Sequence, residues 1–171
     1  IPLVTPFSDG TVDHPALRQL VQHLGSQGVG GLVVCGSTGE AAALSSEEQL
    51  AVQATVESAA QAVPVVMGLS GYHLGETLAW VRTLSQHHLA GLLIPAPHYI
   101  RPSQACLLHW FTALADASAV PVVIYDIPAR TGVQISLSTL RQLAQHPNIR
   151  AIKDCGGDSA KTQARIADGV L

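Results

Sequence analysis

The sequence predicts an α/β fold, a (β/α)8 barrel of which the chain contains about six βα units. Short apolar runs alternate with segments of helical period along all 171 residues, which is typical of βα units and a parallel sheet. Residues 62–66 (AVPVV) recur as 119–123, 57 residues or two units later, so one unit has about 28 residues. Eight such units give roughly 230 residues, close to the ~250 of a complete barrel. We therefore expect residues 1–171 to form a single incomplete barrel domain that lacks its C-terminal units and helices.

Each unit has its own signals. Strands are predicted at 1–5, 32–35, 65–67, 91–94, 122–125 and 149–153, with the beginning of a seventh at 169–171. Helices are predicted after the caps Asp13, Ser45 (in a capping box with Glu48), Ser103, Ser136 and Asp158, and over about 75–88. Glycines at 28, 30 and 31 end the first helix.

Polar side chains follow four of these strands, and they separate a barrel from an open sheet. They are Ser37 and Thr38, Tyr99, Tyr125 and Arg130, and Lys153. In an open sheet with strands in sequence order, the second and sixth strands would lie about 19 Å apart, at ~4.8 Å per strand. Only closure into a barrel directs all of these side chains to one place, so a shared function requires a barrel.

Composition excludes several classes of function. The chain is 47% hydrophobic and 12% charged, with net charge −3 and no basic cluster, which argues against a nucleic-acid partner. No apolar run has the ~18 residues that a membrane helix needs. Three cysteines in no zinc spacing favour free thiols and a cytoplasmic location, and the histidines form no metal-binding pair. We expect no metal site and no membrane contact.

Lys153 is the strongest candidate for chemistry. It is the last residue of a short apolar strand and is followed by a Gly-containing loop, so its amine should be partly removed from water. An amine must be neutral before it can attack a carbonyl, and burial favours the neutral form. The alternative is a structural lysine whose stem packs while its head reaches water. The cysteine that follows the strand, Cys155, is expected to be a small buried residue rather than a reactive thiol.

Four motifs together resemble the dihydrodipicolinate synthase / N-acetylneuraminate lyase family of Schiff-base aldolases. They are Gly36-Ser37-Thr38-Gly39-Glu40, Tyr99 with Arg101-Pro102-Ser103-Gln104, Tyr125-Asp126-Ile127-Pro128-Ala129-Arg130-Thr131-Gly132, and Ile152-Lys153-Asp154. The resemblance extends from Val4 to the end of the chain. It implies that Lys153 forms an imine with pyruvate and that no other cofactor is needed.

The resemblance also implies roles for the remaining side chains. Tyr125 would shuttle protons beside the lysine, and Ser37 would link that relay to the pyruvate carboxylate, which Thr38 also binds. Tyr99 matches a relay tyrosine that the family supplies across a dimer interface. Arg130 would bind a carboxylate of the second substrate. The family further implies a homo-oligomer, a dimer of dimers.

The Pro-x-Arg-Thr-Gly pattern resembles the synthase branch, whose aldehyde carries a carboxylate. The expected reaction is condensation of pyruvate with L-aspartate 4-semialdehyde to 4-hydroxy-tetrahydrodipicolinate, in lysine and diaminopimelate biosynthesis. A related aldolase acting on a 2-keto-3-deoxy sugar acid or on 4-hydroxy-2-oxoglutarate is the alternative. A third possibility is an inactive barrel fragment that is stable only through partners, because strands one and six would have open edges.

Overall fold

The computed structural model describes residues 1–169 and divides into two compact units. Unit 1 contains Ile1–Leu69 and His88–Leu92, and unit 2 contains Ser70–His87 and Leu93–Leu171. Residues 170 and 171 of the expected seventh strand lie outside the described part of the chain. Among residues 1–169, no helix has both the length and the apolar character needed to cross a membrane.

Unit 1 begins differently from the prediction. Instead of a strand over 1–5, the structure has an isolated parallel bridge between Pro2 and Val33. The proline has no N–H to donate, so the pairing depends on the neighbouring Leu3 N–H and on Val33. A hairpin that was not predicted follows, with β1 (Phe7–Ser8) antiparallel to β2 (Thr11–Val12). The Asp-Gly dipeptide between them, with φ of 50° and 79°, is the usual signal for such a turn.

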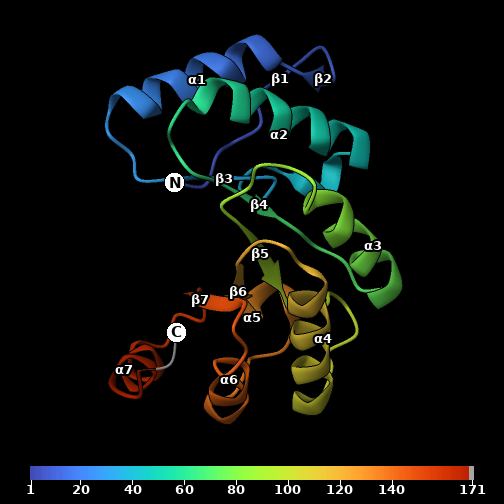
Figure 1. Ribbon diagram of the computed structural model, residues 1–171, viewed down its shortest axis with the longest axis vertical. Helices are drawn as coiled ribbons and strands as arrows, with labels where there is room; N and C mark the ends of the chain where they lie inside the picture. Colours follow the sequence, from blue (N-terminus) through green and yellow to red (C-terminus); the bar gives the residue numbers. More distant parts are fainter. Residues whose placement is uncertain (170–171) are drawn as a thin grey trace. The chain divides into compact units, whose positions relative to one another are not determined.

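The remainder of unit 1 confirms the predicted βα order. It contains α1 (His14–Ser26), β3 (Leu32–Val34), the 3-10 helix η1 (Ala41–Ala43), α2 (Ser46–Ala60) and β4 (Val65–Gly68). The Asp13 cap and the Ser45–Glu48 capping box both form as expected. Strand β3 pairs with β4 in parallel, and α1 lies beside α2 (Figure 1).

Unit 2 carries the larger number of helices. Its elements are α3 (Leu74–Leu84), the end of β5 (Gly91–Pro95), α4 (Gln104–Ala117), β6 (Val122–Asp126), α5 (Pro128–Thr131), α6 (Leu137–Leu143), β7 (Ile149–Asp154) and α7 (Ser159–Ala167). Ser103, Ser136 and Asp158 cap α4, α6 and α7 as predicted. Helix α3 ends four residues earlier than expected, and the short α5 was not predicted.

The strands pair in sequence order, as expected for successive parallel βα units. In unit 1 the order is β3-β4-β5, and in unit 2 it is β5-β6-β7. The first two residues of β5 belong to unit 1 and its last three to unit 2. The chain is thus a parallel sheet with alternating helices, part of a (β/α) barrel.

The core of unit 2 forms where α4 packs beside α3 and α6. Leu107, Phe111 and Leu114 lie at helical spacing on one face of α4, and none of them is exposed. Ile124 on β6 and Leu140 on α6 are also fully buried. This apolar packing supports β6 and β7, the two strands that carry the polar residues described next.

Candidate functional site

Tyr125 and Lys153 occupy paired positions at the carboxyl ends of neighbouring parallel strands. Strand β6 pairs with β7 so that Tyr125 lies opposite Lys153 and Asp126 opposite Asp154. Residues opposite each other in a sheet direct their side chains to the same face, so the tyrosine and lysine meet. The lysine Nζ lies 4.4 Å from the centre of the tyrosine ring. The ring is buried, and the lysine is half-buried, as the sequence predicts for the lysine.

The Lys153 amine contacts the face of the Tyr125 ring. A cation over a tyrosine ring is attracted by the negative face of the ring, by about 0.5–1 kcal/mol or more. The Lys153 head lies at the strand end over this ring. The amine thus lies over the face of a ring whose phenol is the kind of group that exchanges protons during a reaction at an amine.

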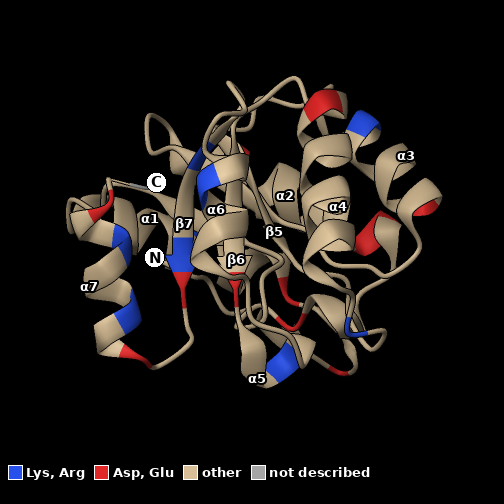
Figure 2. Ribbon diagram, turned by 90° about the horizontal axis from the view of Figure 1, so that it is seen from below, with Lys and Arg blue, Asp and Glu red and all other residues tan. Residues whose placement is uncertain are grey.

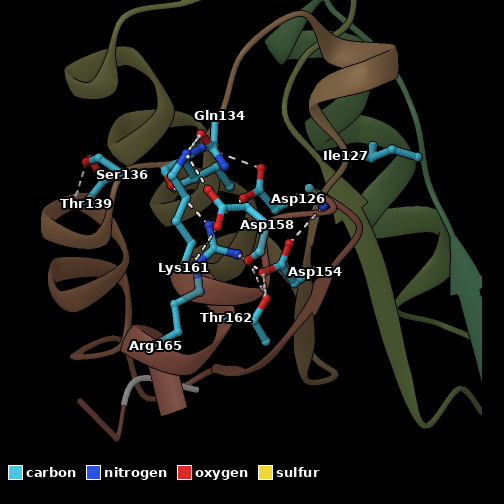
Figure 3. A network of polar contacts seen from close by, with 12 residues as sticks. Asp126, Ile127, Gln134, Ser136, Thr139, Asp154, Asp158, Lys161, Thr162 and Arg165 are labelled. Atoms are coloured by element: carbon cyan, nitrogen blue, oxygen red, sulfur yellow. Dashed lines mark hydrogen bonds and ion pairs between the residues drawn. The ribbon is translucent and has the colours of Figure 1, made fainter. Parts of the chain in front are cut away.

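A buried charge cluster of Asp126, Asp154 and Arg165 lies on the opposite face of the same two strand ends (Figure 3). Arg165 extends from α7, and its Nη2 donates to Asp126 Oδ2 at 2.6 Å and to the Ile135 carbonyl at 3.2 Å. Its Nη1 lies 2.5 Å from Asp154 Oδ2. Both strands end in an acidic residue, with a basic residue just before it on β7 (Figure 2).

The two carboxyl groups of this cluster differ in their electrostatics. Burial raises the pKa of Asp126, and its contacts with Arg165 offset only part of that effect. Burial alone would also raise the pKa of Asp154. Hydrogen bonds from the Gly156 N–H and the Thr162 hydroxyl, together with the charge of Arg165, outweigh burial and lower it. Asp154 therefore loses its proton more readily than Asp126 does.

Arg165 and Asp154 were not predicted as members of the site. The acidic residues at the strand ends and the arginine on α7 are visible in the sequence, but nothing in their spacing indicates that they meet. Arg165 is buried while the next residue, Ile166, is 74% exposed, so the apolar pattern of the helix does not reveal the arginine's need for an anionic partner. The expectation for Cys155 was wrong, because that residue is exposed.

Arg130 lies on α5, directly after β6. Gly132 caps the helix with a φ of 69°, which is favourable for glycine, and a Cβ at this position would lie 2.7 Å from Arg101 Nε. Arg130 is exposed, and its charge contributes, after burial, to lowering the pKa of His98. It is thus an available guanidinium near the loop that follows β5.

Tyr99, in that loop, is exposed to solvent. Its side chain is 93% exposed and its φ is +70°, which is uncommon for a non-glycine residue. Arg101, two residues later, also has a positive φ, of 44°. The structure therefore does not bring Tyr99 to the Tyr125–Lys153 pair within one chain.

Ser37 and Thr38 follow β3 in unit 1, as predicted, in a tight turn. The Gly39 N–H donates to the Gly36 carbonyl at 3.1 Å, and the Thr5 hydroxyl donates to the Gly39 carbonyl at 2.7 Å. Thr5 therefore holds the turn in place, a role that the sequence did not reveal. Within residues 1–169, no group of acidic, histidine or cysteine side chains is arranged to hold a metal ion.

Successive parallel strands with intervening helices define the chain as part of a (β/α) barrel, whose functional side chains lie at the carboxyl ends of strands. A sequence model described as the dihydrodipicolinate synthetase family matches residues 1–169. The chain belongs to this family.

Three relatives illustrate the similarity. The 4-hydroxy-tetrahydrodipicolinate synthase of Limosilactobacillus fermentum is 43% identical over 90% of this chain and 50% of that protein. The synthase of Geobacter metallireducens is 39% identical over 98% of this chain and 58% of that protein. A chloride-inhibited dihydrodipicolinate synthase from Acinetobacter baumannii, crystallised with pyruvate, is 34% identical with a TM-score of 0.94, over 98% and 58%. The chain spans about half the length of the curated relatives it matches.

Proposed function

We propose that the whole protein condenses pyruvate with L-aspartate 4-semialdehyde through an imine on Lys153, as a lyase of lysine and diaminopimelate biosynthesis. The observation that carries this proposal is the Lys153 amine 4.4 Å from the centre of the Tyr125 ring at paired strand ends. The family supports it, because relatives covering most of this chain are named 4-hydroxy-tetrahydrodipicolinate synthase. Pyruvate in the Acinetobacter baumannii structure supports the choice of the first substrate.

The proposed chemistry begins at the amine. Neutral Lys153 attacks the ketone carbon of pyruvate, and the carbinolamine loses water to give an imine. Each of these steps moves a proton between nitrogen and oxygen, and the Tyr125 phenol is the acid–base group beside the amine. A base then takes a proton from the methyl group while the C–H electrons move toward the imine nitrogen, and the resulting enamine attacks the aldehyde carbon, whose oxygen takes up a proton. The amino group of the semialdehyde finally attacks the imine carbon and displaces Lys153, which closes the ring of the product and frees the amine. The reaction requires no cofactor.

Further residues are assigned by this proposal. Ser37 and Thr38 bind the pyruvate carboxylate with the N–H groups of their turn, and Ser37 continues the proton relay. Arg130, exposed on α5, binds the carboxylate of the semialdehyde. Tyr99, which is exposed in its own chain, serves a second copy in a homo-oligomer. The free thiols at Cys35, Cys106 and Cys155 are in keeping with the cytoplasm.

Borohydride trapping tests the proposal. The whole protein is treated with pyruvate and borohydride and then mapped by peptide mass spectrometry, and we expect a reduced pyruvate adduct on Lys153. The Lys153→Arg variant should form no adduct, because a guanidinium stays protonated and cannot form the imine. Turnover of that variant at the parent rate would refute the proposal.

A second variant tests the aldehyde. Arg130→Ala should retain adduct formation but lose most semialdehyde turnover, since a hydrogen bond to a charged group contributes about 1.5–3 kcal/mol, or about tenfold or more. Unchanged semialdehyde turnover in this variant would point instead to another pyruvate-dependent aldolase. Screening aldehydes against the trapped enamine then identifies the acceptor.

A further inference from the structure

The charge cluster of Asp126, Asp154 and Arg165 lies directly behind the candidate catalytic pair. Asp126 follows Tyr125 on β6, and Asp154 follows Lys153 on β7. Because successive side chains of a strand point to opposite faces, the reacting groups lie on one face and the cluster on the other. A shift of one strand end relative to the other therefore moves both the reacting groups on one face and the charge cluster on the other.

A gain in folding stability alone does not explain why these three charged side chains are buried. The side chains of Arg165 and Asp126 are 6% and 1% exposed, and that of Asp154 is 15% exposed. Removing charges from water is costly, and apolar replacements of such clusters are often at least as stable. The cluster also carries one more negative than positive charge, so attraction within it is incomplete. A geometric role explains it better.

The guanidinium is suited to such a role. It is a rigid plane with donors on two sides, so it can hold two carboxylates at a set separation. Here one nitrogen contacts the carboxylate at the end of β6 and another contacts the carboxylate at the end of β7 (Figure 3). The last backbone hydrogen bond between these segments, from the Cys155 N–H to the Asp126 carbonyl, is at the same level. Beyond it the strands separate into loops.

Taking the proposed imine chemistry as its basis, we propose that Arg165 is a positioning residue for that reaction. By binding the carboxylates at the ends of β6 and β7, it sets the spacing between the Tyr125 ring and the Lys153 amine. It acts through the strands and touches neither substrate nor reacting atoms. Its contact with the Ile135 carbonyl ties the same strand ends to the segment that leads into α6.

Two variants separate geometry from charge. Arg165→Met keeps a long side chain but removes both ion pairs, so no side chain then links Asp126 to Asp154 at the ends of β6 and β7. A misplacement of about 1 Å can cost on the order of a hundredfold in rate, and we expect imine formation to slow at least tenfold. Arg165→Lys keeps the charge at a single point that cannot hold both carboxylates in one plane, so it should recover only part of the rate.

A matched control is the exposed ion pair between α6 and the end of α7. Arg141 on α6 binds Asp168, the residue after α7, through Nε at 2.5 Å and Nη2 at 2.9 Å. Arg141→Met thus removes another bidentate arginine–aspartate pair, one that anchors the end of α7 but involves neither Asp126 nor Asp154. It should leave the rate of imine formation within about twofold of the parent, since surface ion pairs contribute little.

The experiment measures timed borohydride trapping in the whole protein, at saturating pyruvate and at borohydride concentrations that no longer limit the rate. For Arg165→Met we expect a rate constant at least ~tenfold lower, full final adduct on Lys153, and pyruvate half-saturation within about twofold. A merely structural role would instead lower the final amount of adduct at an unchanged rate constant, because it reduces only the folded fraction.

Three results would overturn the positioning role. They are a rate constant within twofold of the parent, a loss of amplitude alone, or an equal slowing by Arg141→Met. If Arg165→Met does not fold, Arg165→Lys and Asp126→Asn are judged by the same criteria. A parent protein that forms no adduct on Lys153 refutes the proposed function itself. A normal adduct in the parent with an unaffected Arg165→Met refutes only the positioning role.

Discussion

Asn148 offers a test of how stability and chemistry are divided between the two ends of β6 and β7. It precedes β7 and accepts a backbone hydrogen bond from the Val122 N–H, so it lies at the amino ends of both strands. Its side-chain Nδ2 donates to three carbonyls, those of Ala115 at 3.0 Å, Ser118 at 2.8 Å and Val120 at 3.1 Å. These carbonyls belong to the end of α4 and the loop that leads into β6.

The magnitude follows from this geometry. One amide group has two protons, so it can make about two good hydrogen bonds among three contacts. At roughly 1 kcal/mol net for each, and with water replacing part of the loss at a half-buried site, Asn148→Ala should cost about 1–2 kcal/mol. Asn148→Asp places an acceptor-only carboxylate against three carbonyl oxygens. It should therefore cost about 1 kcal/mol more than the alanine variant, although its shape is nearly unchanged.

Urea unfolding of the whole protein at neutral pH measures both variants, and timed borohydride trapping measures their chemistry. In barrels of this type the amino-terminal face serves stability and the carboxyl-terminal face serves catalysis. We therefore expect both variants to keep the parent rate constant for the adduct on Lys153. An aspartate variant as stable as the alanine variant would show that amide donation is not what Asn148 contributes.

Two further predictions concern the strand ends. The pKa of Asp154 lies below its ordinary value of 3.8, so its ionised form contributes stability that is present above that value and lost as pH falls through the folded pKa. Between about pH 5 and about pH 2, the urea midpoint of the parent should fall more steeply than that of Asp154→Asn, and parallel curves would contradict this. At the end of β4, a Cβ on Gly68 would lie 2.5 Å from the Cys35 carbonyl oxygen, and backbone cannot move aside as a side-chain tip can. Gly68→Ala should thus lose at least ~2 kcal/mol, whereas Gly31→Ala, whose Cβ would lie 3.5 Å from its nearest contact, should lose less than about 1. Equal midpoints for these two variants would refute the steric argument.

The sequence by itself determined the order of elements and the places where helices begin. Caps act on N–H groups two or three residues away, so Asp13, Ser45, Ser103, Ser136 and Asp158 could be read without any tertiary information. The placement of Tyr125 and Lys153 at strand ends was likewise readable, because short apolar runs have visible limits. The strand predicted over residues 1–5 was wrong, because the apolar run there contains a proline that lacks a backbone N–H donor.

Only the tertiary structure decided which residues meet. Register pairs Tyr125 with Lys153, and a slip of one residue would turn every side chain of β7 to the other face. The contact of Arg165 with Asp126 spans 39 positions, and no local pattern in the sequence expresses the docking of α7 against two strand ends. Asp126 and Asp154 belong to one cluster only because α7, later in the chain, places the Arg165 guanidinium against both of them. The physical reason is that a charged group can be buried only beside groups of opposite charge, and only the folded chain brings such partners together.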